Sequence, residues 1–153
     1  MTIPAELQFS RALLNGLAQL LASRGVGVWN PIGKYTVNEL ALTISGLPAV
    51  PDTAISLAVY GTGGDDLDSG DSTVLVQARM RAKSDPRDAS DYADAVFSVL
   101  HGLTETRLAS GVLVLLARRT VVAPPSRDSS GRWERADSYE LMVHWPTVQR
   151  DDE

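Results

Sequence analysis

Leucine and other apolar residues recur at steps of three and four positions in two segments, a spacing that places them on one face of a helix. In residues 4–25, Pro4 suits the first turn and Gly25 stands where a helix should end. In residues 85–102, Asp85 is a suitable N-cap. The apolar positions are Leu7, Leu13, Leu14, Leu17, Leu20 and Leu21 in the first segment and Ala89, Tyr92, Ala93, Val96, Phe97 and Leu100 in the second. The sequence therefore predicts two amphipathic helices.

Period-two alternation replaces the helical spacing between these segments. Residues 72–82 alternate Val74, Val76, Ala78 and Met80 with mostly polar positions, which is typical of a half-buried strand. The run AISLAVY at 54–60 predicts a second strand. The intervening GTGGDDLDSGD at 61–71 is too polar for a core, so we expect a solvated loop there.

The last third of the chain predicts a long antiparallel hairpin. Residues 111–122 begin apolar on both faces, as an interior strand does, and residues 139–146 alternate again. They are joined by APPSRDSSGR at 123–132, whose Pro, Asp, Ser and Gly residues favour turns, so we expect a mobile tip. Residues 26–48 are expected to form an irregular connection with one or two short strands.

This order of elements favours an α+β fold, because helices and strands do not alternate strictly. We expect a mainly antiparallel β-sheet with two α-helices packed on one face and a long C-terminal β-hairpin. A length of 153 residues suits one domain over 1–153, and the acidic tail at 147–153 is expected to be flexible.

Composition excludes several classes of function. A net charge of -5 without a basic run argues against gripping nucleic acid through its phosphates. The absence of cysteine excludes disulfides, thiolate nucleophiles and zinc–cysteine or iron–sulfur sites. The N-terminal segment has polar breaks before any apolar run of membrane-spanning length, so we expect no signal peptide or membrane anchor and folding in a cytoplasm.

Residues with possible chemistry have simpler structural roles. His101 ends a helix and His144 lies on the polar side of a strand, and neither accompanies a serine in a nucleophile-elbow context. The loop aspartates Asp65, Asp66, Asp68 and Asp71 suit a hard cation, but their spacing does not match an EF-hand. The glycines of this loop lack the Lys-Ser/Thr of a phosphate-binding loop. We therefore expect no catalytic residue, cofactor or metal.

Mixed charges around an aromatic residue indicate a protein interface instead. At the expected hairpin tip, Trp133 is flanked by Arg132, Glu134 and Arg135, a composition enriched where proteins contact proteins. We assign these four residues to a subunit or partner interface, and the alternative that Trp133 folds back onto its own sheet stays open. The assignment extends to the basic strand end, Arg118 and Arg119, and to Asp65, Asp66 and Asp68 in the loop 61–72, which would order on assembly.

Several stretches, taken in order, resemble one protein family. They are GVGVWNPIGKYTVNE, LPAVPDTAISLAVYGTGGDD, DSTVLVQARMRAKSDPRDASDYADAVFSVLHGL and GRWERADSYELMVHWP, which together span about Gly25 to Pro146. The chain resembles the minor capsid or tail terminator proteins of long-tailed bacteriophages, especially those of actinobacterial hosts. This group has no catalytic signature to transfer.

The resemblance implies an α+β subunit of a virion, made in the host cytoplasm. It would form a six-membered ring at the phage neck that caps the tail tube protein and joins it to the head–tail connector. Genomic DNA would pass through the lumen without sequence recognition. A different class of function stays open: a small metal-dependent hydrolase or nucleotide-processing domain that uses the aspartate-rich loop.

Overall fold

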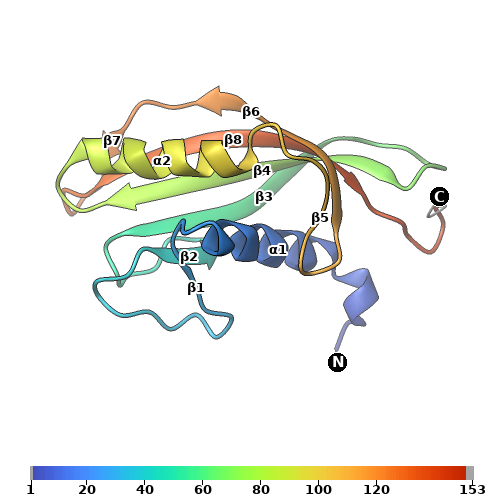
Figure 1. Cartoon of the computed structure of the whole chain (residues 1–153), viewed down its shortest axis with the longest axis horizontal. Helices are drawn as coiled ribbons and strands as arrows, with labels where there is room; N and C mark the ends of the chain where they lie inside the picture. The colour runs from blue at the N-terminus through green and yellow to red at the C-terminus, as the bar shows by residue number, and fades with distance from the viewer. Residues whose placement is uncertain (1, 151–153) are drawn as a thin grey trace.

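A computed structural model describes residues 2–150 as two helices beside a long curled sheet (Figure 1). The elements in chain order are η1 Ala5–Leu7, α1 Phe9–Ser23, β1 Val28–Trp29, β2 Ala41–Ile44, β3 Ala54–Asp65, β4 Asp71–Ala82, α2 Pro86–Leu100, β5 Thr104–Arg107, β6 Leu113–Val122, β7 Ser126–Arg127 and β8 Trp133–His144. The α+β class is confirmed, and β1 and β2 lie between residues 26 and 48, where one or two short strands were expected.

The sheet is mixed, and its strands follow the order β1-β2-β3-β4-β8-β6-β5, with β7 also paired to β8. Within residues 2–150, β1–β2 and β2–β3 are the parallel pairs, and the other five pairings are antiparallel. The expected antiparallel character therefore holds for most of the sheet but not for the β1-β2-β3 part. β6 and β8 are antiparallel neighbours, from Leu113 opposite His144 to Val122 opposite Asp137.

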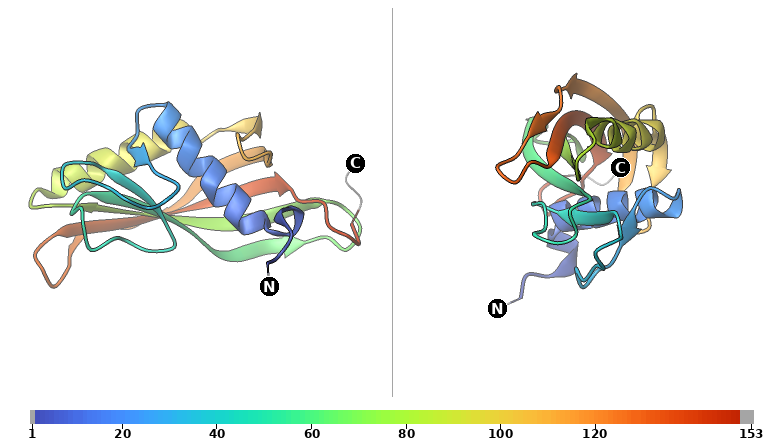
Figure 2. Two further views of the ribbon diagram at one scale, coloured as in Figure 1. Left: turned by 90° about the horizontal axis from the view of Figure 1, so that it is seen from below. Right: turned by 90° about the vertical axis from the view of Figure 1, so that its left-hand side faces the viewer.

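Both helices contribute to one hydrophobic core. Val74, Val76, Ala78 and Met80 alternate along β4 and are all buried, together with the leucines of α1 and the apolar residues of α2. α1 contacts β1, β2 and β3, whereas α2 contacts β4, β6 and β8 (Figure 2). The alternating pattern of β4 thus sets which face of the sheet the helices cover.

The first helix starts later than the leucine pattern indicates. η1 ends at Leu7, and α1 begins only at Phe9 because Gln8 adopts a non-helical backbone conformation and donates a side-chain hydrogen bond to the Ile3 carbonyl. The second helix begins as expected, since the Asp85 carboxylate accepts a hydrogen bond from the Arg87 backbone N–H at 2.9 Å. In residues 2–150, no helix is both long and apolar enough to span a membrane.

Two strands extend into stretches that were expected to be loop. β3 continues to Asp65 with register shifts beside its glycines, and a Cβ at Gly63 would lie 2.7 Å from Thr73 Cγ2, so only glycine fits there. β8 starts at Trp133, six residues before the expected strand. The first half of this strand is rich in polar residues, so its sequence does not alternate between apolar and polar positions. Some of these polar residues nevertheless face the core, as ion pairs. The four-residue strand β5 was not predicted.

The edge of the sheet curls back to α1. The loop between β5 and β6 reaches the helix, where the Ser110 hydroxyl donates a hydrogen bond to the Ala12 carbonyl at 2.6 Å. A Cβ at Gly16 would lie 2.4 Å from Ser110 Oγ, so glycine permits this close approach. The contact closes one side of the core and leaves the two ends of the long strands as distinct surfaces.

Candidate assembly surfaces

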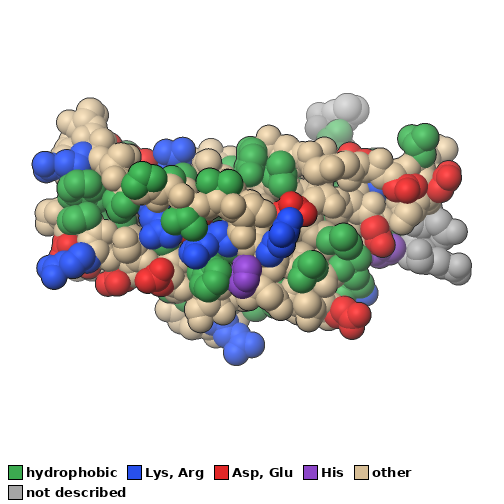
Figure 3. All heavy atoms as spheres, turned by 90° about the horizontal axis from the view of Figure 1, so that it is seen from above, with side chains coloured by type: hydrophobic (Ala, Val, Ile, Leu, Met, Phe, Trp, Pro, Cys, Tyr) green, Lys and Arg blue, Asp and Glu red, His purple; other side chains and the backbone are tan. Residues whose placement is uncertain are grey.

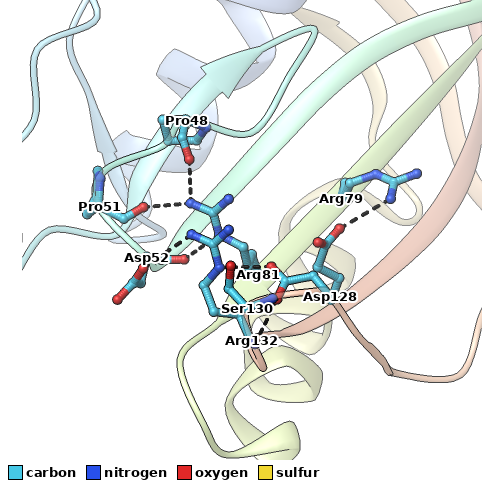
Figure 4. A network of polar contacts seen from close by, with 9 residues as sticks. Pro48, Pro51, Asp52, Arg79, Arg81, Asp128, Ser130 and Arg132 are labelled. Atoms are coloured by element: carbon cyan, nitrogen blue, oxygen red, sulfur yellow. Dashed lines mark hydrogen bonds and ion pairs between the residues drawn. The ribbon is translucent and has the colours of Figure 1, made fainter.

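The first surface lies where β4 ends and β8 begins, and we call it the clasped end: residues 48–52, Arg81, Asp128 and Arg132. The Arg81 side chain is 4% exposed and donates to the carbonyls of Pro48, Pro51 and Asp52 (Figure 4). Desolvation lowers the pKa of this guanidinium, and the three carbonyls accept from its Nε and Nη2 groups. Arg81 therefore fixes the loop before β3 onto the end of the sheet.

Arg132 adds a second connection at the clasped end. Its Nε lies 2.8 Å from Asp128 Oδ2 and its Nη1 lies 3.3 Å from Asp52 Oδ1. Burial alone would raise the pKa of Asp128, but hydrogen bonds from the Arg132 backbone N–H and guanidinium and from the Ser130 N–H lower it overall. The turn before β8 is thereby tied to the loop before β3.

Strand alternation separates the four residues assigned to the tip. Trp133 and Arg135 share the face of Tyr139 and Leu141, whereas Glu134 points to the opposite face and pairs with Arg79 at 3.3 Å. Trp133 belongs to β8 rather than to a loop, and it is half-buried beneath the Arg127 guanidinium, 5.5 Å from its ring centroid. Trp133, Glu134 and Arg135 therefore lie at the start of β8 and not in the tip of a loop, and the assignment of the four residues to an interface stays a prediction.

A buried ion cluster lies between the sheet and α2. Asp137 is 1% exposed and pairs with Arg135 at 2.9 Å and with Arg119 at 3.6 Å. The Arg119 guanidinium also stacks on the Phe97 ring at 4.0 Å, so α2 covers it. Burial raises the pKa of the neighbouring Tyr139 hydroxyl, although Arg119 partly offsets this. Arg119 and Arg135 thus stabilise the interior of their own chain.

Arg118 lies on the open face of the sheet, opposite the helices. It pairs with Glu140 at 3.4 Å, and both side chains are substantially exposed. Leu116 and Met142 lie opposite each other on the same face and are also exposed. Figure 3 shows hydrophobic side chains scattered among charged ones on the surface seen from above, with acidic side chains dominant at its right end.

The second surface is the acidic tip, which we define as Asp65, Asp66, Leu67 and Asp68 in the β3–β4 turn. Asp66 Oδ1 accepts hydrogen bonds from the backbone N–H groups of Asp68 and Ser69, which lowers the pKa of Asp66. Within residues 2–150, no three His, Asp or Glu side chains are placed to hold a metal ion. The aspartates instead shape a turn that presents Leu67 to solvent, with 88% of it exposed.

Both histidines have partners within the fold. His101 Nδ1 accepts a hydrogen bond from the Arg119 backbone N–H at 3.0 Å, and its ring stacks on Phe97. His144 Nδ1 lies 3.1 Å from Asp71 Oδ1 at the tip end of the sheet. This geometry supports the structural roles that the sequence predicted for them.

A third surface is a groove between α1 and the β1–β2 edge, and we call it the α1 groove. Its volume is about 580 Å³. Trp29, Ile32 and Ile44 supply apolar walls, and Arg11 supplies the charge of the lining. The Tyr35 hydroxyl accepts from the Asn30 N–H and donates to the Leu42 carbonyl, so it ends the pairing of β1 with β2 and opens the groove beyond Leu42. Sequence reasoning missed this groove because its walls come from separate segments.

Comparison with known proteins decides the family. A protein-family model described as bacteriophage tail terminator protein matches residues 20–145, from within α1 to just beyond β8. The chain belongs to this family. The resemblance seen in the sequence is confirmed, and the protein is a structural protein of a phage tail. No curated protein matches the chain.

A solved structure supports the fold of this tail terminator family member. A chain of the virion of a native gene transfer agent particle aligns with a TM-score of 0.52 at 15% identity. The alignment covers 67% of this chain and 78% of that chain. At this identity the likeness concerns the fold alone.

Proposed function

We propose that this tail terminator forms a six-membered ring that caps the tail tube at the phage neck and joins it to the head–tail connector. The family match over residues 20–145 carries the proposal. Capping needs no bond chemistry, because covering the exposed end of a polymer stops its growth by geometric complementarity. The same ring offers a new surface to the connector.

The shape of the subunit supports a ring. A ring of identical subunits needs two different patches that meet head to tail. The long strands β3, β4 and β8 carry different chemistry at their two ends, and the open face carries Arg118, Leu116 and Met142 between them. Such a subunit has distinct patches for a neighbour, for the tube and for the connector.

The residues first assigned to an interface divide into two groups. Arg118, Trp133 and Glu134 keep accessible surface, so we retain them as proposed contact residues together with Arg132 and the acidic tip. Arg119 and Arg135 hold the buried Asp137, so their proposed contribution to an interface is indirect, through the shape of β8 beneath α2.

DNA passage is part of the same proposal. The net charge of -5 suits a lumen through which a polyanion slides, because a basic lining would retain phosphates. Recognition of a base sequence would require polar contacts to base edges and is not part of the proposed role.

Deletion and complementation test this function. Cells infected by a phage that lacks this gene should yield filled heads and tails of irregular length that remain unjoined in electron micrographs. The wild-type gene supplied in trans should restore joined particles, and a Trp133→Ala variant should restore fewer of them. Tails of normal length that are attached to filled heads without this polypeptide would refute the proposal.

A further inference from the structure

Leu67 occupies an unfavourable position for an isolated subunit. It is the most exposed large apolar side chain of the described residues, at 88%, and acidic residues flank it on both sides. A single exposed leucine is ordinary on a protein surface. This one stands at the end of a projecting hairpin, farther out than the helices reach (Figure 1).

The turn that carries Leu67 is already organised. Two backbone N–H groups bond to Asp66, and the Ser69 hydroxyl accepts from the Asp71 N–H at 3.2 Å. Arg150 donates to the Asp66 carbonyl and to the Ser72 hydroxyl, which ties the turn to the chain segment after β8. A turn held in this way loses little conformational entropy on binding, so it suits a docking element.

The α1 groove has the complementary chemistry. Its walls are apolar at Leu14, Trp29 and Ile32, and Ile32 is 77% exposed. Among residues 2–150, no acidic residue lines the groove and none forms an ion pair with Arg11. A volume of about 580 Å³ accommodates a leucine side chain with the backbone of its turn.

We infer that the acidic tip of one subunit inserts Leu67 into the α1 groove of the next copy of this chain, with Asp68 beside Arg11. No tip residue lines the groove of its own chain, so the two patches remain available for different neighbours. Each subunit then offers one tip and one groove, the head-to-tail arrangement that closes into a ring. Opposite charges at the rim of the groove orient the approaching tip, while Leu67 packs against the apolar walls.

This inference rests on the proposed ring and names its subunit contact. The chain has no cysteine, so a Leu67→Cys/Ile32→Cys double variant tests the contact directly. Supplied to the phage that lacks the gene and oxidised in purified particles, it should give a ladder of covalent multimers that collapses on reduction. Each single variant is the matched control and should give no species beyond a dimer.

Charge exchange provides a second test that does not depend on disulfide geometry. Asp68→Lys alone and Arg11→Glu alone should each lower the yield of joined particles by about tenfold, because like charges then meet at every subunit contact. The Arg11→Glu/Asp68→Lys double variant should recover to within about twofold of wild type. Circular dichroism of each purified variant confirms that the fold is kept.

The outcomes separate this contact from the proposed function. Joined particles of the cysteine variant without a multimer ladder, or an unrescued charge exchange, would overturn the contact while capping by a ring still stands. A Leu67→Cys subunit that becomes covalently attached to a tube protein by a thiol-directed photocrosslinker would also overturn it. Tails that are joined normally without the polypeptide would refute the function itself.

Discussion

The charged residues at the two ends of the long strands differ in burial and in hydrogen bonding. At the clasped end, Arg81 and Arg132 are turned inward and bonded to carbonyls and carboxylates of their own chain. At the acidic tip, the charges of Asp65 and Asp68 face solvent beside the exposed Leu67. The same strands, β3 and β4, run between both ends.

The two ends differ in whether a charged side chain has its bonding partner within the same chain. A buried arginine needs hydrogen-bond partners within the fold, and Arg81 has them at Nε and Nη2, so the clasped end contributes to stability. Exposed carboxylates around an apolar side chain add little to stability, and they remain free to meet a basic and apolar surface. The clasped end should therefore be sensitive in unfolding experiments, and the tip in assembly experiments.

The sharpest test of this contrast is Arg81→Met. Loss of the guanidinium leaves three carbonyls without a donor, so the free energy of unfolding should fall by about 3 kcal/mol. The matched control is Arg79→Met, two residues away on the same strand, whose exposed pair with Glu134 should be worth less than about 1 kcal/mol. Urea unfolding measures both, and equal losses would contradict the assigned role of Arg81.

A smaller effect is expected for Arg132→Ala. Arg132 holds Asp128 and Asp52 but stays partly exposed, so its removal should cost about 1 kcal/mol. Arg118→Ala removes a single, more exposed pair with Glu140 and should cost less. A larger loss for Arg118 than for Arg132, measured by the same urea titration, would show that the open face and not the clasped end carries the ionic stabilisation.

Acid should weaken both ends through their hydrogen-bonded carboxylates. The pKa values of Asp128 and Asp66 are lowered in the folded chain, so the unfolded chain takes up protons first as pH falls. Their stabilisation is fully present above about pH 4 and is lost as the pH falls through the folded pKa values. Asp128→Asn should make the decline of stability between neutral and acidic pH shallower, and an unchanged decline in urea titrations would contradict this.

The smallest effect on stability is expected for Leu67→Ser. The side chain has almost no contact within its own chain, so the free energy of unfolding should change by no more than about 0.5 kcal/mol. Leu57→Ala, a fully buried residue of the same strand pair, should cost about 3 kcal/mol. The yield of joined particles should nevertheless decrease with Leu67→Ser. A wild-type yield from this variant, at wild-type stability, would contradict the proposed role of the tip in assembly.

Sequence reasoning succeeded where burial follows a local period. The leucines of α1 and the alternating residues of β4 predict their elements because one side of each faces the core. It failed in the first half of β8, where Arg135 and Asp137 look like loop residues but neutralise each other beneath α2. A charged residue becomes a core residue only through a partner, and the partner Arg119 lies on another strand.

The candidate surfaces divide in the same way. The aspartates of the tip and Trp133 stand out in the sequence, and the family resemblance could be read from ordered stretches of the chain. The α1 groove and the hydrogen bonds of Arg81 at the clasped end could not be predicted from the sequence, since each joins segments that are distant along the chain.

The sequence by itself determined the helices, most of the strands and the family, because these depend on the order and spacing of residues along the chain. Only the tertiary structure decided which charges are internal and which face outward. That choice depends on desolvation and on the distance to an opposite charge, and both are set when remote segments pack together.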